Sequence, residues 1–163
     1  MTKLIIFDFW GTLMNQGVYS PLKQVKNILR IDMPFSDFVI KFENVLFIEV
    51  YPDLQSGFEA VVKEFELKVP PFVMEKLIGM WNKNRLLAAP FPETLAVLED
   101  LKKDYRLAII SNTDGFSVSS VIEKYQLEKY FDYIYYHGEF SILVILYLRQ
   151  LLFWSQISVF LHP

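Results

Sequence analysis

The sequence of 163 residues contains no cysteine. Disulfide bonds, thiolate nucleophiles and cysteine-ligated zinc sites are therefore excluded. Positive charge is also scarce, with 16 Lys and Arg against 19 Asp and Glu and a formal net charge of −3. Because nucleic-acid binding needs clustered Lys and Arg, we expect no nucleic-acid partner. A chain without cysteine fits a reducing compartment, so we expect a cytoplasmic protein.

Long apolar segments are missing from the first 139 residues. Asp8 interrupts the N-terminal apolar run, which is therefore too short for a signal peptide, and no later segment up to Glu139 has the length of a membrane span. Residues 140–163 differ, because Arg149 is their only charged residue. A membrane anchor there is the minor alternative, since Arg149 splits the segment and residues 142–154 are too few to span a bilayer. We expect no membrane partner.

What the sequence has in abundance is apolar and aromatic side chains, at 53% and 17% of the residues. This content supports a real core, and the length fits one domain with a modest insertion. The stretch KLIIFDFWGTL opens the chain. Its apolar run predicts a buried strand over residues 3–7 that ends at Asp8, followed by a loop in which Gly11 and Thr12 signal a turn.

Residues 18–88 have a helical texture divided by prolines. Apolar side chains recur at spacings of three and four after Pro21, Pro34, Pro52 and Pro70, so we expect about four helices. Ser20 precedes Pro21 and is predicted to cap the first of them. The block is long for a connection between two strands. We therefore interpret residues 18–88 as a helical cap inserted after the first strand.

The rest of the chain alternates between helix and strand patterns. Such alternation predicts an α/β fold with a Rossmann-like parallel sheet, in which the first two strands are neighbours. The core would comprise residues 1–17 and 89–163. The expected elements are a helix over 94–105, a strand over 106–110, a helix over 117–125 and a strand over 132–136.

The change in composition after Glu139 has two explanations that the sequence leaves open. Residues 140–163 are either a native end that covers the first strand or the product of out-of-frame translation. Within this segment we expect a buried helix over 142–154 and a fourth strand over 157–161. An apolar end on an incomplete sheet could also support a homodimer.

Polar side chains follow the first two predicted strands. Asp8 ends the first strand, and Ser111 follows the second. Ligands of open α/β sheets bind at the carboxyl ends of the strands. A carboxylate there can be a metal ligand, a general base or a nucleophile. The hydroxyls of Ser111 and Thr12 suit a tetrahedral anion, and Mg²⁺ would screen the repulsion between that anion and Asp8.

Three stretches resemble the haloacid dehalogenase-like hydrolase superfamily: FDFWGTL, PFPETLAVLEDLKKDYRLAIISNTD and YFDYIYYHGE. The resemblance covers residues 3–139 and implies a small-molecule substrate. It implies that Asp8 is the nucleophile, that Thr12 maintains the loop, and that Ser111 contacts the phosphoryl group. Asn112 would orient the substrate. Mg²⁺ would be held by Asp8 and the backbone carbonyl of Trp10, a residue that also contacts substrate.

The chain departs from the superfamily pattern at three places. Phosphatases of the superfamily have a second Asp, the general acid and base, where this chain has Trp10. They also have a Lys after the third strand and acidic metal ligands after the fourth, but this chain has no Lys, Asp or Glu after Glu139. Each lost electrostatic contact of this kind costs about 3 kcal/mol in the transition state. We therefore expect impaired turnover.

Three functions remain open at this point. The first is Mg²⁺-dependent hydrolysis of a small phosphorylated metabolite through Asp8. The second is 2-haloacid dehalogenation, because dehalogenases of the superfamily carry an aromatic residue at the position of Trp10, and a halide leaves without a proton. The third is a catalytically dead relative that only binds a ligand or has no function.

Overall fold

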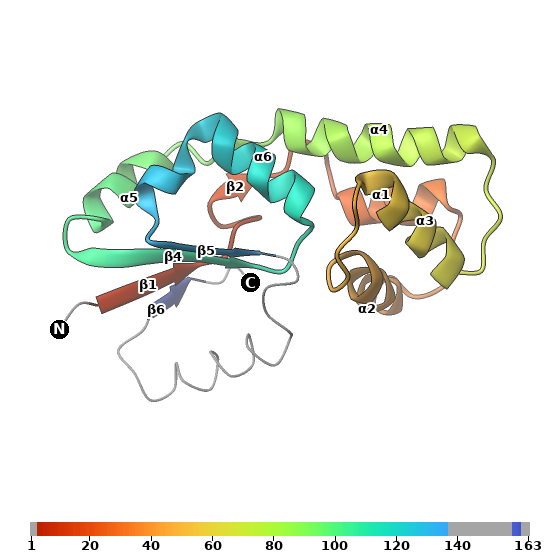
Figure 1. Ribbon diagram of the computed structural model, residues 1–163, viewed down its shortest axis with the longest axis horizontal. Coiled ribbons are helices and arrows are strands. Elements are labelled where there is room, and N and C mark those ends of the chain that lie inside the picture. Colours follow the sequence, from red (N-terminus) through yellow and green to blue (C-terminus); the bar gives the residue numbers. More distant parts are fainter. Residues whose placement is uncertain (1–2, 137–157, 161–163) are drawn as a thin grey trace.

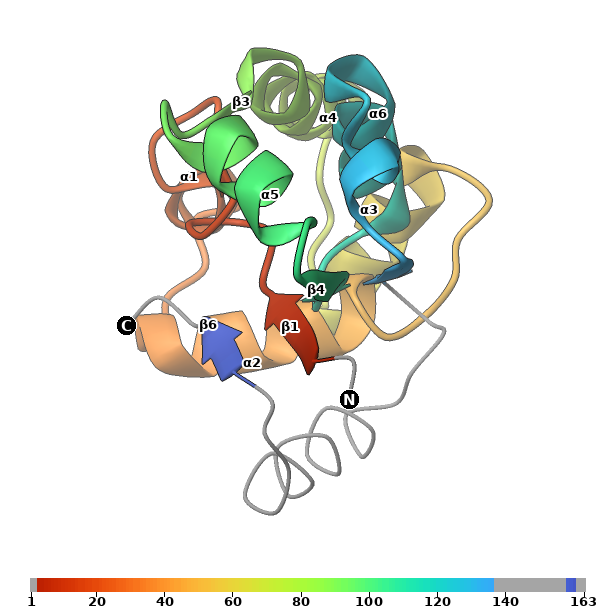
Figure 2. The same ribbon diagram turned by 90° about the vertical axis from the view of Figure 1, so that its left-hand side faces the viewer.

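A parallel sheet forms the centre of the protein, for which a computed structural model describes residues 3–136 and 158–160. The strands lie in the order β5–β4–β1–β6, and each pairs in parallel with its neighbour (Figure 2). This confirms the α/β class and the Rossmann-like sheet. The strand bounds are β1 Lys3–Phe7, β4 Tyr105–Ser111, β5 Tyr133–Tyr136 and β6 Ser158–Phe160.

The pairing register brings the first two expected strands side by side. Lys3 pairs with Tyr105 and Phe7 with Ile109, so the two strands end at the same edge of the sheet. On the other side of β1, Phe7 pairs with Phe160 of β6, which confirms the fourth strand. The helix expected over residues 142–154 lies outside the described residues.

Between β1 and β4 the chain forms four helices, which together we call the helical unit. They are α1 Pro21–Ile28, α2 Phe35–Leu46, α3 Leu54–Glu64 and α4 Pro71–Leu87. Figure 1 shows the helical unit beyond the end of the sheet toward which β1 and β4 run. Its aromatic interior centres on Trp81, whose ring lies 5.8 Å from that of Phe42 and 5.6 Å from that of Phe58. These side chains belong to a buried hydrophobic cluster that is separate from the cluster beside the sheet.

The sheet is covered on one face by two further helices (Figure 1). They are α5 Thr94–Leu101 and α6 Gly115–Tyr125, with a short 3-10 helix, η1 Leu127–Tyr130, after α6. Apolar side chains of β1 and β4, such as Phe7 and Ile109, pack with Leu98 of α5 and Val121 of α6 into one buried cluster. This packing holds the carboxyl ends of β1 and β4 in fixed positions.

The chain passes between the sheet and the helical unit through a second, two-stranded sheet. In it β2 Met14–Asn15 pairs antiparallel with β3 Ala89–Pro90. Gly17 follows β2 and lies against the end of α4: a β-carbon there would collide with the carbonyl oxygen of Asn84 and the backbone nitrogen of Ala88. The two crossings, at which the chain enters and leaves the helical unit, are therefore held close together. Only glycine fits at position 17 between them.

Three local expectations need correction. Ser20 precedes α1 as expected, but its side chain makes no capping hydrogen bond, because its backbone is left-handed with φ of 48°. The helix expected over residues 94–105 ends at Leu101, where the backbone nitrogen of Asp104 bonds to its carbonyl in a tightened last turn, and Tyr105 already belongs to β4. Helix α6 begins at Gly115 rather than residue 117, because Asp114 caps it.

No helix among residues 3–136 is both long and apolar enough to cross a membrane.

Candidate active site

Asp8 lies at the carboxyl end of β1, beside the carboxyl end of β4. Its Oδ1 accepts hydrogen bonds from the backbone nitrogen of Phe9 at 2.7 Å and from the hydroxyl of Ser111 at 3.1 Å. The structure therefore brings together two of the residues that the sequence singles out, from positions more than 100 residues apart. Because both bonds go to Oδ1, the second oxygen, Oδ2, is the one available to a substrate.

The electrostatic environment of Asp8 is set mainly by burial. Loss of solvent raises the pKa of the carboxyl above its ordinary value, and the hydrogen bonds from Phe9 and Ser111 offset part of that increase. Perturbed carboxyl groups of this kind gather at functional sites. Ser111 thus has two effects, because it fixes the position of the carboxylate and favours its ionised form.

The loop after Asp8 is a tight turn that depends on Gly11. Gly11 has φ of 79°, a conformation that L side chains adopt at a cost. Its nitrogen donates to the carbonyl of Met14 at 2.9 Å, and the nitrogen of Met14 donates to the carbonyl of Phe9 at 3.0 Å. The Thr12 hydroxyl is buried, and no described residue is its hydrogen-bond partner. The expected role of Thr12 in the loop stays a prediction.

Trp10 ties the first loop to the second. Its indole Nε1 donates to the hydroxyl of Thr113 at 3.1 Å, and its ring packs edge-on against Phe9 at 4.9 Å. The side chain is partly buried against the core beside the sheet. An indole held in this way is a positioning and packing group and cannot supply a proton to a leaving group.

A small cavity of about 150 Å³ lies next to these loops. We call it the Glu43 cavity, after the residue that α2 contributes to it. Trp10 and the exposed Asn112 line it on the side of the sheet, and Trp81 lines it from α4. The cavity is therefore bounded by the loops after β1 and β4 on one side and by the helical unit on the other.

The motif analysis missed Glu43, Trp81 and Asp114. Asp114 is buried, and its Oδ1 caps α6 by accepting from the nitrogen of Ser117 at 2.8 Å. Its Oδ2 accepts from Nε1 of Trp81 at 3.0 Å, which links α6 to the helical unit. The Asp-Gly pair at the start of α6 signals a cap, but no sequence pattern connects it to a tryptophan 33 residues away.

A family model described as haloacid dehalogenase-like hydrolase matches residues 5–141. The chain belongs to this family. The match includes the loop after Asp8, the helical unit and the end of β4, so it covers every element described at the site. The sequence-based assignment to the superfamily is thereby confirmed.

Solved structures of the same fold include several haloacid dehalogenase-like hydrolases. One from Xanthomonas campestris has a TM-score of 0.58 at 16% identity, covering 99% of this chain and 75% of its own. A predicted phosphoglycolate phosphatase from Haemophilus somnus has a TM-score of 0.54 at 18% identity, with coverages of 97% and 76%. An L-2-haloacid dehalogenase has a TM-score of 0.51 at 21% identity, with coverages of 98% and 75%. A search of curated proteins found no match.

The described part of this haloacid dehalogenase-like hydrolase does not complete a magnesium site. Asp8 and the carbonyl of Trp10 are the expected ligands, but no group of three or more acidic or histidine side chains lies together among residues 3–136. Mg²⁺ binds tightly only with several oxygen ligands in near-octahedral geometry. The described residues do not fit a resident Mg²⁺.

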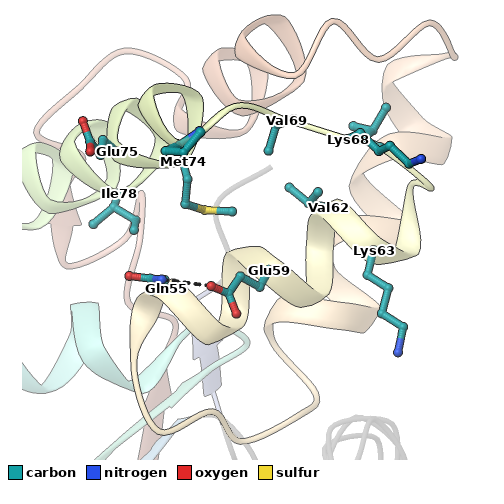
Figure 3. Close-up of a pocket in the computed structure, with 11 residues that line it drawn as sticks. Gln55, Glu59, Val62, Lys63, Lys68, Val69, Met74, Glu75 and Ile78 are labelled. Atoms are coloured by element: carbon teal, nitrogen blue, oxygen red, sulfur yellow. Dashed lines mark hydrogen bonds between the residues drawn. The ribbon is translucent and has the colours of Figure 1, made fainter.

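A second, larger cavity of about 710 Å³ lies within the helical unit, away from Asp8 (Figure 3). All of its lining residues belong to α3, α4 and the connection between them, and Val62, Met74 and Ile78 contribute apolar surface. Gln55 and Glu59 are hydrogen-bonded to each other at 2.9 Å across one turn of α3. None of the candidate catalytic residues lines this space.

Proposed function

We propose that the protein hydrolyses a small phosphate ester with Asp8 as its nucleophile. The observation that carries this proposal is the 3.1 Å hydrogen bond from the Ser111 hydroxyl to Oδ1 of Asp8. Because the bond from Phe9 also goes to Oδ1, Oδ2 is the oxygen that attacks. Membership in the hydrolase family sets the reaction class. The raised pKa of Asp8 means that nucleophilic activity grows as the pH rises and the carboxyl ionises.

The reaction has two displacements at phosphorus. Oδ2 of Asp8 attacks, the bond from phosphorus to the leaving oxygen breaks, and an aspartyl phosphate forms. The leaving alkoxide takes its proton from water, because Trp10 occupies the position where a carboxyl would serve. Water then attacks the phosphorus of the aspartyl phosphate, which releases inorganic phosphate and restores Asp8. When substrate binds, the single proton of the Ser111 hydroxyl turns from Oδ1 of Asp8 to a phosphoryl oxygen, and Asn112 orients the substrate.

We also propose that residues 18–88 act as a cap on a core made of residues 1–17 and 89–163. Support comes from the paired crossings at β2 and β3 and from the separate hydrophobic cluster of the helical unit. A cap that contributes to the Glu43 cavity would select the leaving group, while the core holds the phosphate. Cytoplasmic action on a small metabolite is the setting we propose.

Trp10 favours one other reaction, the displacement of halide from a 2-haloacid. A halide leaves without a proton, so that reaction needs no proton donor at the position of Trp10. The substrate carboxylate, however, needs a cationic partner, and none of the residues that line the Glu43 cavity is Lys or Arg. Release of chloride from chloroacetate would establish this second reaction.

The decisive experiment measures hydrolysis of p-nitrophenyl phosphate with and without Mg²⁺, for the protein and for Asp8→Asn. We expect slow turnover that falls in the variant on the order of 10³-fold or more, the effect of losing a nucleophile. Comparing the two Mg²⁺ conditions tests the cofactor expected from the family. Equal rates in both proteins, or no rate in either, would contradict the proposal and favour a binding-only relative.

A further inference from the structure

The lining of the Glu43 cavity is aromatic on several sides. Trp10 lies at the catalytic loop, Phe47 follows α2, and Trp81 lies on α4. The ring centroids of Phe47 and Trp81 are 6.4 Å apart. At about 150 Å³ the cavity accommodates a group of a few non-hydrogen atoms rather than a whole metabolite. Aromatic faces are electron-rich, so they attract cations.

Two polar groups in this lining lack partners among the described residues. The carboxylate of Glu43 takes part in none of the hydrogen bonds or ion pairs found there, and burial raises its pKa above the ordinary value. The hydroxyl of Ser117, a residue only 2% exposed, is likewise without a partner. The buried hydroxyl of Ser117 costs free energy while it has no partner. The half-buried carboxylate of Glu43 offers its charge to a bound donor.

Several other polar residues of the cavity lining already have hydrogen-bond partners. Both oxygens of Asp114 accept hydrogen bonds, from Ser117 and from Trp81. The side-chain oxygen of Asn84 accepts from the backbone nitrogen of Val18 at 3.1 Å. Among the described residues, the charged members of the lining are the acids Glu43 and Asp114, and none is Lys or Arg. The charge of the lining therefore favours a cationic group over an anionic one.

We propose that the Glu43 cavity binds a small ammonium group, and that the protein consequently prefers phosphate esters whose alcohol carries an amine. This preference rests on the proposed phosphatase function, whereas binding of the amine itself does not. The ammonium would donate hydrogen bonds to the carboxylate of Glu43 and the hydroxyl of Ser117, and its carbon atoms would lie against Trp10 and Trp81. The phosphate end of the same molecule would reach Asp8.

Binding is tested with ethanolamine and glycolate, two compounds of almost the same size and opposite charge. Intrinsic tryptophan fluorescence reports binding, because Trp10 and Trp81 line the cavity, and calorimetry gives the affinity. We expect ethanolamine to bind and glycolate not to bind. In Glu43→Gln the ethanolamine Kd should rise by about 10- to 100-fold, as expected for loss of a charged hydrogen-bond partner.

Glu75→Gln is the matched control, since Glu75 is an exposed carboxylate on α4 that lines the other cavity. It should leave the ethanolamine Kd unchanged. Burial disfavours the charge of Glu43, so Glu43→Gln should keep the thermal midpoint of the unmodified protein, which separates lost binding from lost folding. Equal binding of glycolate, or an unchanged Kd in Glu43→Gln, would overturn the proposal.

Turnover of phosphoethanolamine and phosphoglycolate tests the ammonium site and the phosphatase function separately. We expect kcat/KM to favour phosphoethanolamine at least tenfold and to lose that preference in Glu43→Gln. Ethanolamine binding that depends on Glu43, without hydrolysis of any ester, would support the ammonium site and contradict the phosphatase. Hydrolysis that prefers phosphoglycolate would support the phosphatase and overturn the ammonium site.

Discussion

At the scale of single residues, Ser111 is the group on which the chemistry of Asp8 depends. Its hydroxyl lies 3.1 Å from Oδ1 of Asp8, and its hydrogen bond lowers a pKa that burial raises. The nucleophile must be ionised to attack. The balance between burial and hydrogen bonding therefore decides the pH at which the protein begins to work.

Replacing Ser111 by alanine should shift this balance in one direction. In Ser111→Ala the pKa of Asp8 rises further, so the acid limb of the pH–rate profile moves to higher pH. Loss of one donor to the transition state should also lower kcat by about 10²-fold. Rates measured for p-nitrophenyl phosphate across the acid range would show both effects.

Ser119→Ala is the control for this experiment. Ser119 is exposed on α6, and its hydroxyl bonds to the carbonyl of Gly115 at 2.7 Å. Its replacement should leave the pH profile where it is. An acid limb that stays in place in Ser111→Ala would show that Ser111 does not act on Asp8.

The sequence predicted that Asp8 and Ser111 lie together, but it did not predict the surroundings of the cavity. Asp8 and Ser111 each follow a short apolar run, and parallel strands bring such ends to one edge. Glu43 lies at an ordinary position of an amphipathic helix, and nothing in the local pattern marks it. Its importance arises only when α2 packs beside the catalytic loops, which is a tertiary effect.

At the scale of elements, the chain is closely packed where it crosses between the sheet and the helical unit. The short strands β2 and β3 pair there, and Gly17 lies against the end of α4. Two-residue strands carry no periodicity, which is why the sequence predicted only a loop at this point. The helices and longer strands, by contrast, follow directly from apolar spacing and proline positions.

Replacing Gly17 by alanine adds a methyl group and tests how closely the chain approaches α4 at this crossing. Gly17→Ala should destabilise the protein by about 1–3 kcal/mol, because the new carbon collides with backbone atoms of Asn84 and Ala88 that cannot move aside easily. In Gly79→Ala, within α4, the new carbon meets nothing within 4 Å. That variant should be more stable by about 0.5–1 kcal/mol, the helix preference for alanine. Urea unfolding measures both, and a neutral Gly17→Ala would refute the close approach.

At the scale of the whole molecule, two hydrophobic clusters are joined through few polar contacts. The bond from Trp81 to Asp114 links the interior of the helical unit to α6, and the bond from Val18 to Asn84 links the first crossing to α4. Trp81 therefore belongs to the core of one cluster and also fixes its position relative to the other. The Glu43 cavity lies at this junction.

Removing the indole N–H should weaken the junction. Trp81→Phe retains an aromatic ring but leaves Oδ2 of Asp114 buried without its donor, so we expect a loss of about 1–3 kcal/mol in unfolding free energy. A double-mutant cycle with Asp114→Ala isolates the contact, and its coupling energy should exceed about 0.5 kcal/mol. Strictly additive effects would mean that the bond contributes nothing to joining the clusters.

The pairing of β1 with β4 also imposes an order on folding during synthesis. Lys3 pairs with Tyr105 and Asp8 bonds to Ser111, each about a hundred residues later in the chain, whereas the hydrophobic cluster of the helical unit lies within residues 22–81. At ribosomal speeds of roughly 5–20 residues per second, about a hundred residues take on the order of 5–20 s to appear. During that interval β1 emerges as an apolar strand with no neighbour, a segment suited to chaperones. Asp8 thus gains Ser111 as its partner only after the helical unit has been synthesised.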